Sequence, residues 1–126
     1  MGKKARVLVV DDEPAVLNVV ARMVERLGYH AVTTQHGKEA LRIIEEENIQ
    51  LLLLDVMLKD ITIAELVNRA HTHHGPRTIV LMSGHFRELE IRLARTIPFL
   101  EKPFTILELK SALEQAQSQE VDRELV

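Results

Sequence analysis

Short apolar stretches alternate with longer amphipathic stretches along the whole chain. Five of the apolar stretches are rich in Val, Ile and Leu and are too short for a buried helix, which predicts β-strands. They are RVLVV (6–10), HAVTT (30–34), IQLLLL (49–54), RTIVLM (77–82) and IPFL (97–100). Strict alternation of strands and helices predicts an α/β protein, with parallel strands joined by right-handed crossovers and helices on both sheet faces.

The first helix is predicted over residues 14–27. Pro14 suits the first helical turn, and Gly28 suits the left-handed position just after a helix. Apolar residues at helical spacing define one predicted buried face. They are Val16, Val19, Val20, Met23, Val24 and Leu27.

The other helices are predicted from caps and periodicity. Thr62 and Thr105 each precede a glutamate by three residues, the capping-box spacing that predicts the starts of the third and fifth helices. The second helix is predicted over 37–47. The fourth is predicted over 85–95, although Ile91 lies off its apolar face.

Composition limits the classes of function. The 126 residues fit one domain, and 46% hydrophobic with 28% charged residues is typical of a globular protein. A net charge of -3 without a basic stripe argues against nucleic-acid binding by this domain. The absence of cysteine excludes disulfides and thiolate metal sites. No apolar run has membrane-spanning length and no secretory signal pattern opens the sequence, so we expect a cytoplasmic protein without membrane contact.

Polar side chains follow four of the five predicted strands. Asp11 and Asp12 follow the first strand, Asp55 the third, Ser83 the fourth and Lys102 the fifth. The carboxyl ends of parallel strands meet at one edge of the sheet, where open α/β sheets bind ligands. Three carboxylates there suit Mg²⁺, which takes few protein ligands and keeps several waters. Adjacent acids repel one another unless a cation shares the site, and Lys102 supplies positive charge nearby.

Four motifs at these strand ends occur in order: VVDDEP, LLLLDVM, MSG and LEKPF. Together they resemble the receiver domain of two-component response regulators over nearly the whole chain. The resemblance implies a single flavodoxin-like, doubly wound (βα)5 domain over residues 1–118, with a parallel five-stranded sheet in the order 2-1-3-4-5. Residues 119–126 would form a polar C-terminal tail, either a frayed helix end or the start of a tether.

The resemblance also implies roles for the strand-end residues. A sensor histidine kinase or a phosphotransfer protein would pass a phosphoryl group from phosphohistidine to Asp55. Carboxylates serve as nucleophiles in such transfers, and catalysis is mainly positioning and charge stabilisation. Asp11, Asp12, Asp55 and the backbone carbonyl of Met57 would hold Mg²⁺. Lys102 would bind a phosphoryl oxygen.

A conformational switch is implied as well. The Ser83 hydroxyl would move to a phosphoryl oxygen, and Phe99, three residues before the lysine, would turn inward behind it. This local charge event would change a surface formed by the fourth helix, fifth strand and fifth helix. A homodimer through the fourth and fifth helices is compatible with the resemblance. Because Phe99 has no hydroxyl, apolar burial would favour its inward state.

The loop after Asp55 departs from the family pattern. Lys59 replaces a usual proline and Ile63 a usual glycine. Glycine adopts backbone angles that a β-branched residue resists, so we expect a reshaped or mobile loop. Lys59 would lean over the phosphate or compete with Mg²⁺.

Each motif taken singly has a simpler interpretation: the acids as helix caps, the Ser-Gly pair as a turn, and the Lys-Pro pair as a loop. His71, His73 and His74 raise the question of a metal site, but a solvated helix end is favoured because no second type of ligand accompanies them.

Three classes of function compete. The leading one is a phosphorylatable signalling receiver, stand-alone or part of a larger regulator or hybrid kinase. The second is a receiver-like interaction module that does not respond to phosphate, as the changed loop would allow. An enzyme such as a phosphatase or flavoprotein is disfavoured, because the chain has no Asp-x-Asp pair, no Gly-rich phosphate loop and few aromatics. We therefore expect no activity beyond self-catalysed phosphorylation and dephosphorylation of Asp55.

Overall fold

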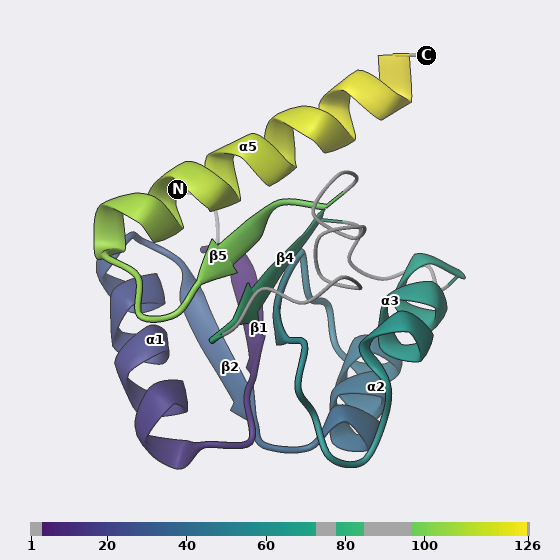
Figure 1. The fold of residues 1–126 in the computed structure, drawn as a ribbon. Helices are drawn as coiled ribbons and strands as arrows, with labels where there is room; N and C mark the ends of the chain where they lie inside the picture. Colours follow the sequence, from purple (N-terminus) through teal and green to yellow (C-terminus); the bar gives the residue numbers. More distant parts are fainter. Residues whose placement is uncertain (1–3, 73–77, 85–96, 126) are drawn as a thin grey trace.

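The computed structural model describes residues 4–72, 78–84 and 97–125. Strands and helices alternate in the order β1 (Arg6–Val10), α1 (Pro14–Arg26), β2 (His30–Thr34), α2 (Gly37–Glu46), β3 (Leu51–Asp55), α3 (Ile63–Thr72), β4 (Thr78–Ser83), β5 (Phe99–Glu101) and α5 (Ile106–Leu125). All strand pairs are parallel, and the sheet order is β2-β1-β3-β4-β5 (Figure 1). The predicted fold class and strand order are confirmed. The predicted fourth helix, 85–95, lies outside the described residues.

The sheet separates two apolar layers. Helices α1 and α5 cover one face and α2 and α3 the other (Figure 1). In β3, Leu52 and Leu54 belong to the α2/α3 layer, while Leu51 and Leu53 belong to the α1/α5 layer. All four are buried, as a central parallel strand requires. The two layers hold the strands in register and so align their carboxyl ends.

Strand ends differ slightly from the sequence prediction. Asp55 and Ser83 are the last residues of β3 and β4 and do not follow them. β5 begins at Phe99, two residues later than predicted, although Ile97 is already buried in the core. Differences of one or two residues are ordinary at element ends.

The buried face of α1 is narrower than predicted. Leu17, Val20 and Val24 are its buried residues, and Leu17 was not among the predicted ones. Val19 is 54% exposed, so its assignment to the buried face was wrong. Residues 17, 20 and 24 lie on one stripe of a helix, and position 19 falls to the side of that stripe. The apolar surface of α1 therefore extends beyond the area that the sheet covers.

Both predicted Thr caps are confirmed. The Thr62 hydroxyl accepts a hydrogen bond from the Glu65 N–H at 3.2 Å, and α3 begins at the next residue. At α5 the capping box is reciprocal, since Thr105 and Glu108 each donate a backbone N–H to the other's side chain. The predicted start of each helix is correct. Helix α5 continues to Leu125, so much of the predicted polar tail is helical.

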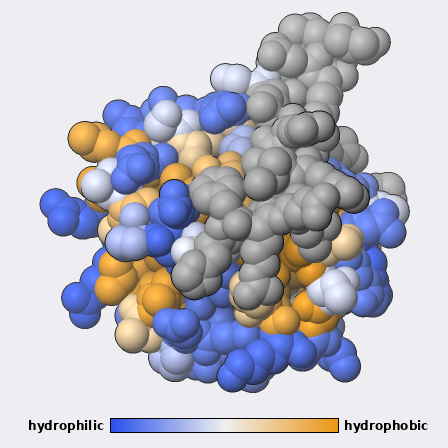
Figure 2. Space-filling view, in the orientation of Figure 1, coloured by the Kyte–Doolittle hydropathy of each residue, from blue (hydrophilic) through white to orange (hydrophobic). Residues whose placement is uncertain are grey.

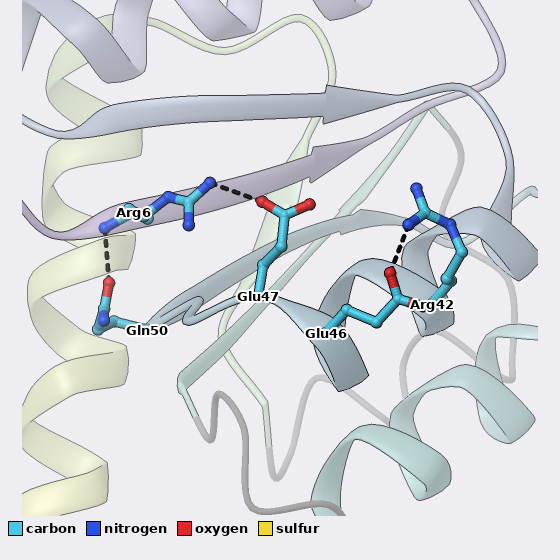
Figure 3. Close-up of polar contacts among 5 residues, drawn as sticks. All are labelled: Arg6, Arg42, Glu46, Glu47 and Gln50. Atoms are coloured by element: carbon cyan, nitrogen blue, oxygen red, sulfur yellow. Dashed lines mark hydrogen bonds and ion pairs between the residues drawn. The ribbon is translucent and has the colours of Figure 1, made fainter.

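Side-chain hydrogen bonds stabilise the amino-terminal ends of the strands, opposite the carboxyl ends. The Arg6 guanidinium donates to Glu47 at 2.7 Å, and the Arg6 N–H donates to the Gln50 side chain, also at 2.7 Å (Figure 3). A second pair, Arg42 with Glu46, lies on the surface of α2. Such partly exposed pairs contribute little stability individually, so the packed layers dominate. None of the described helices is long and apolar enough to cross a membrane.

The loop between β3 and α3 is anchored to the start of α2. The Asp60 carboxylate accepts hydrogen bonds from the N–H groups of Gly37 at 2.9 Å and Lys38 at 3.0 Å. Ile61 packs so closely on Gly37 that a Cβ there would collide with it. Ile63, which stands where the resemblance predicts a glycine, is the first residue of α3 and is buried. The loop thus reaches α3 through core contacts instead of a glycine turn.

We predict that Asp60→Ala lowers the free energy of unfolding by about 1 kcal/mol at neutral pH, the usual cost of losing a helix cap. Hydrogen bonds from Lys38 and Gly37 lower the pKa of Asp60. A depressed carboxyl pKa stabilises the fold above the unfolded-state pKa, and this contribution is lost as pH falls through the folded-state pKa. The deficit of the variant, measured by urea unfolding, should therefore shrink in acid. Glu114→Ala, at an exposed acid on α5, is the control, and an equal loss there would contradict the capping role.

Candidate functional site

The carboxyl ends of β1, β3 and β5 bring together two acids and one lysine. The Lys102 ammonium donates a hydrogen bond to Asp11 Oδ2 at 2.9 Å. The same ammonium lies 3.5 Å from Asp55 Oδ2. The predicted convergence of Asp11, Asp55 and Lys102 on one rim is thus present, and the lysine joins the two carboxylates directly.

Backbone groups hold each of these residues in place. The second oxygen of Asp11 accepts the Glu13 N–H at 2.9 Å, just before α1 begins. The second oxygen of Asp55 accepts the Met57 N–H at 3.2 Å. The Lys102 N–H donates to the Ser83 carbonyl at 2.7 Å, which ties the end of β5 to the end of β4. Each charged side chain therefore has its direction set by a local turn or by the strand ladder.

Burial makes the charges of the site interact strongly. Asp11 is fully buried and Asp55 is 5% exposed. Burial, followed by the negative charge of Asp11, raises the pKa of Asp55, and the opposing effects of Lys102 and the Met57 N–H are smaller. Burial alone would lower the pKa of Lys102, but its hydrogen bond to Asp11 and the charges of both acids outweigh burial and raise it. Lys102 therefore stays protonated, whereas the site disfavours the charge of Asp55.

A third carboxylate, Asp12, has an unusual environment. Its Oδ2 atom is buried and receives no hydrogen bond from the described part of the chain. A buried carboxylate oxygen without a donor is costly unless a cation approaches it. Among the described residues, no three His, Cys, Asp or Glu side chains lie together as a ligand set. Mg²⁺ commonly uses one or two carboxylates and completes its shell with water, so the unpaired Asp12 oxygen fits this ion.

A cavity of about 730 Å³ opens beside the acids. Its polar wall includes Asp12, Asp55, Lys59 and Lys102, and its apolar wall comes largely from α1. The remaining lining residues are Glu13, Ala15, Val16, Val19, Val20, Met23, Met57, Gly84, Pro103 and Phe104. Figure 2 shows hydrophobic residues gathered at the lower left, over α1, among hydrophilic neighbours. The cavity thus combines a charged end with an apolar side.

The other predicted site residues are distributed around this centre. Met57 lines the cavity with a half-exposed side chain. Ser83 is buried at the end of β4 and contacts the site through its carbonyl. Phe99, half-buried, packs on the α2/α3 layer. Ile63 lies in that layer, away from the cavity lining, whereas Lys59 is part of the lining.

Among the histidines, His71 lies in the last turn of α3, and His73 and His74 lie outside the described residues.

Sequence reasoning missed two features of the site. One is the apolar wall of α1, because Val16, Val19 and Met23 were all assigned to the buried face. The sequence signal for this wall was that the apolar stripe of α1 is wider than one packing surface can bury. The other is the anchor at Asp60, whose partners at the start of α2 are distant in sequence. No local pattern marks such a contact.

Comparison with known proteins agrees with this geometry. The response regulator receiver domain profile matches residues 7–114. The chain is 30% identical over 114 residues to the alkaline phosphatase synthesis transcriptional regulatory protein PhoP of Bacillus subtilis, covering 88% of this chain and 47% of that protein. It is also 30% identical to the regulatory protein VanR of Enterococcus faecium over 110 residues, which is 82% of this chain and 46% of the relative. The chain thus spans about half the length of these relatives.

Solved structures show the same fold. A CheY-like response regulator receiver domain protein from Methanospirillum hungatei superposes with a TM-score of 0.80 at 24% identity, covering 93% of this chain and 99% of the other. The chain therefore belongs to the response regulator receiver domain family, as its strand-end motifs suggested.

The raised pKa of Asp55 leads to a stability prediction. A carboxyl with a raised folded-state pKa stabilises the fold below its unfolded-state pKa, and this contribution is lost as pH rises through the folded-state value. We expect Asp55→Asn to raise the free energy of unfolding by about 1 kcal/mol at neutral pH without metal, because it removes a disfavoured buried charge. The gain should diminish as pH falls through the raised folded-state pKa of Asp55, and it should vanish below the unfolded-state pKa of about 4.

Urea unfolding at several pH values tests this, with Glu114→Gln on the exposed side of α5 as the control. A loss of stability in Asp55→Asn at neutral pH would show that the attraction between Asp55 and Lys102 outweighs burial and repulsion.

Proposed function

We propose that this receiver domain accepts a phosphoryl group on Asp55 and that the modification changes a protein-binding surface. The observation that carries the proposal is the partly buried ammonium of Lys102, which Asp11 and Asp55 share at the charged end of a cavity. In the transfer, an Asp55 oxygen bonds to phosphorus while the bond from phosphorus to the donor's histidine nitrogen breaks. The electron pair of that bond leaves with the imidazole.

The charge balance of the site favours this transfer. The environment disfavours a negative charge on the Asp55 carboxylate. When an Asp55 oxygen bonds to phosphorus, the negative charge moves outward to the phosphoryl oxygens. Lys102 is already positioned at Asp55 Oδ2 and would pair with one of those oxygens. The Met57 N–H holds the other oxygen of Asp55 and so orients the nucleophile.

We assign the metal position to the same rim. Bound Mg²⁺ would neutralise phosphoryl oxygens during the transfer. The most direct support for this assignment is the Oδ2 atom of Asp12, which is buried and accepts no hydrogen bond from the described residues. Asp11, Asp55 and the Met57 carbonyl are the other proposed protein ligands, and they would contact the ion directly or through the waters that Mg²⁺ keeps. A response regulator from Burkholderia pseudomallei, 21% identical to this chain, has been solved with a phosphorylated aspartic acid and a calcium ion.

The proposed output runs from the site into β4 and β5. The hydrogen bond from the Lys102 N–H to the Ser83 carbonyl couples the two strand ends. We propose that the Ser83 hydroxyl pairs with the phosphoryl group and that Phe99, now half-buried, moves further inward. Such a rearrangement would alter the surface of β5 and α5, where a partner or a second copy could bind.

We further propose that the phosphodonor protein docks on the apolar wall of α1. This wall borders the same cavity as Asp55, so a donor helix lying on it would bring its histidine to the nucleophile. Val19 is half-exposed on this wall although it is apolar. The polar end of the cavity would then receive the phosphohistidine.

A phosphate-independent interaction module is the less favoured function. It was motivated by the changed loop, yet the loop is anchored by Asp60 and leaves Asp11, Asp55 and Lys102 in contact. We propose that Asp55 is modified without turnover of any separate substrate.

Incubation with acetyl phosphate and Mg²⁺ should add one phosphoryl group to the chain, detected by intact-mass spectrometry. Asp55→Asn and removal of Mg²⁺ should each abolish the gain, because the first lacks the nucleophile and the second leaves phosphoryl charge uncompensated. If neither acetyl phosphate nor a histidine-kinase donor produces the gain, the proposal is refuted. A gain that persists in Asp55→Asn would assign the phosphoryl group to another residue.

Val19→Gln should slow phosphotransfer from a kinase or phosphotransfer protein by roughly tenfold, the loss expected for one apolar contact of ~1.4 kcal/mol. The rate of labelling by acetyl phosphate should not change, since this small donor does not need to dock on the apolar wall of α1. Leu107→Gln on α5 is the matched control, because Leu107 is 73% exposed and is not part of the cavity lining. Equal slowing in both variants would contradict docking on α1.

A further inference from the structure

The cavity beside Asp55 has a second cation at its edge. Lys59 lines it together with Asp12, Asp55 and Lys102. The Lys59 side chain is exposed and, within the described ranges, forms no hydrogen bond or ion pair. Lys102, in contrast, is already engaged by two carboxylates. Lys59 is thus a cation whose charge is available to whatever occupies the cavity.

The backbone that carries Lys59 is held on both sides. Leu58, before it, packs against the α2/α3 layer. Asp60, after it, is bonded through both carboxylate oxygens to the start of α2. Ile61 is buried against Gly37. A lysine whose two neighbours are anchored stays within reach of the cavity, even though its own side chain is solvated.

The charges of the site explain what this cation can do. Asp11, Asp12, Glu13 and Asp55 bring four carboxylates to the rim, and in the described residues Lys102 is the cation that contacts two of them. A phosphoryl group on Asp55 adds further negative charge that one ammonium and one Mg²⁺ do not fully neutralise. A second ammonium at the cavity edge would attract that group and repel a divalent cation.

We propose that Lys59 is a second phosphate-directed cation, which strengthens the binding of the phosphoryl group and weakens the binding of Mg²⁺ in its absence. The inference rests on the proposed function, since it assigns a role at the same site. It gives Lys59 an effect on two ligands of opposite charge, and the two effects have opposite signs. A merely structural role of Lys59 in the loop would affect both ligands in the same direction.

The test measures two affinities by amide chemical-shift titration of the intact chain. The probes are Mg²⁺ alone and beryllofluoride, an anionic phosphoryl mimic, at saturating Mg²⁺. In Lys59→Gln we expect Mg²⁺ to bind more tightly and beryllofluoride more weakly, each by roughly two- to tenfold, the range for a unit charge several ångströms away near a surface. Lys59→Arg should retain wild-type affinities. Lys110→Gln, the same charge change at an exposed position on α5, should alter neither.

Salt supplies an independent check. Both differences should largely vanish at ~1 M salt, where the screening length falls to about 3 Å. If Lys59→Gln leaves both affinities unchanged, or shifts both in one direction, the role of Lys59 is refuted while the proposed function stands. If the wild-type chain binds neither probe, the proposed function itself fails.

Discussion

The shared contact of Lys102 with Asp11 and Asp55 is the constraint on which the site depends. Two nearly buried carboxylates that are both ionised repel each other strongly unless a cation lies between them. That cation reaches them only when β1, β3 and β5 end at the same edge of the sheet. The apolar layers on both faces impose this alignment, because they hold the strands parallel and in register. The charged rim is therefore a consequence of packing far from it.

The contact with Lys102 does not compensate all the negative charge at the rim. Asp55 carries a charge that its surroundings disfavour, and Asp12 has a buried oxygen without a donor in the described residues. Sites with disfavoured charges or unpaired buried polar atoms are commonly functional, since a ligand supplies the missing interaction. Here the missing interactions are a cation near Asp12 and a group that moves negative charge away from Asp55. Divalent metal and phosphoryl group together have those properties.

An apolar helix surface and an anchored loop surround the rim. Helix α1 has more apolar surface than the sheet can cover, and the excess lines the cavity. The loop after β3 lacks the proline and glycine of the family pattern, yet Asp60 and Ile61 anchor it to α2. The anchored loop thus leaves the contacts of Asp55 with Lys102 and Met57 in place.

Local sequence determined the elements and the chemistry of this protein. Apolar runs of strand length, the Thr caps at 62 and 105, and Gly28 with its positive φ follow from short-range physics, which a sequence displays directly. The polar residues at the strand ends were equally visible, and parallel strands required them to meet.

Tertiary structure alone decided which side of α1 the sheet would cover, which backbone groups Asp60 would cap, and that Lys102 would bond to Asp11 more closely than to Asp55. These outcomes depend on distances between residues far apart in the chain. Such distances are set by the packing of whole layers and not by any local pattern.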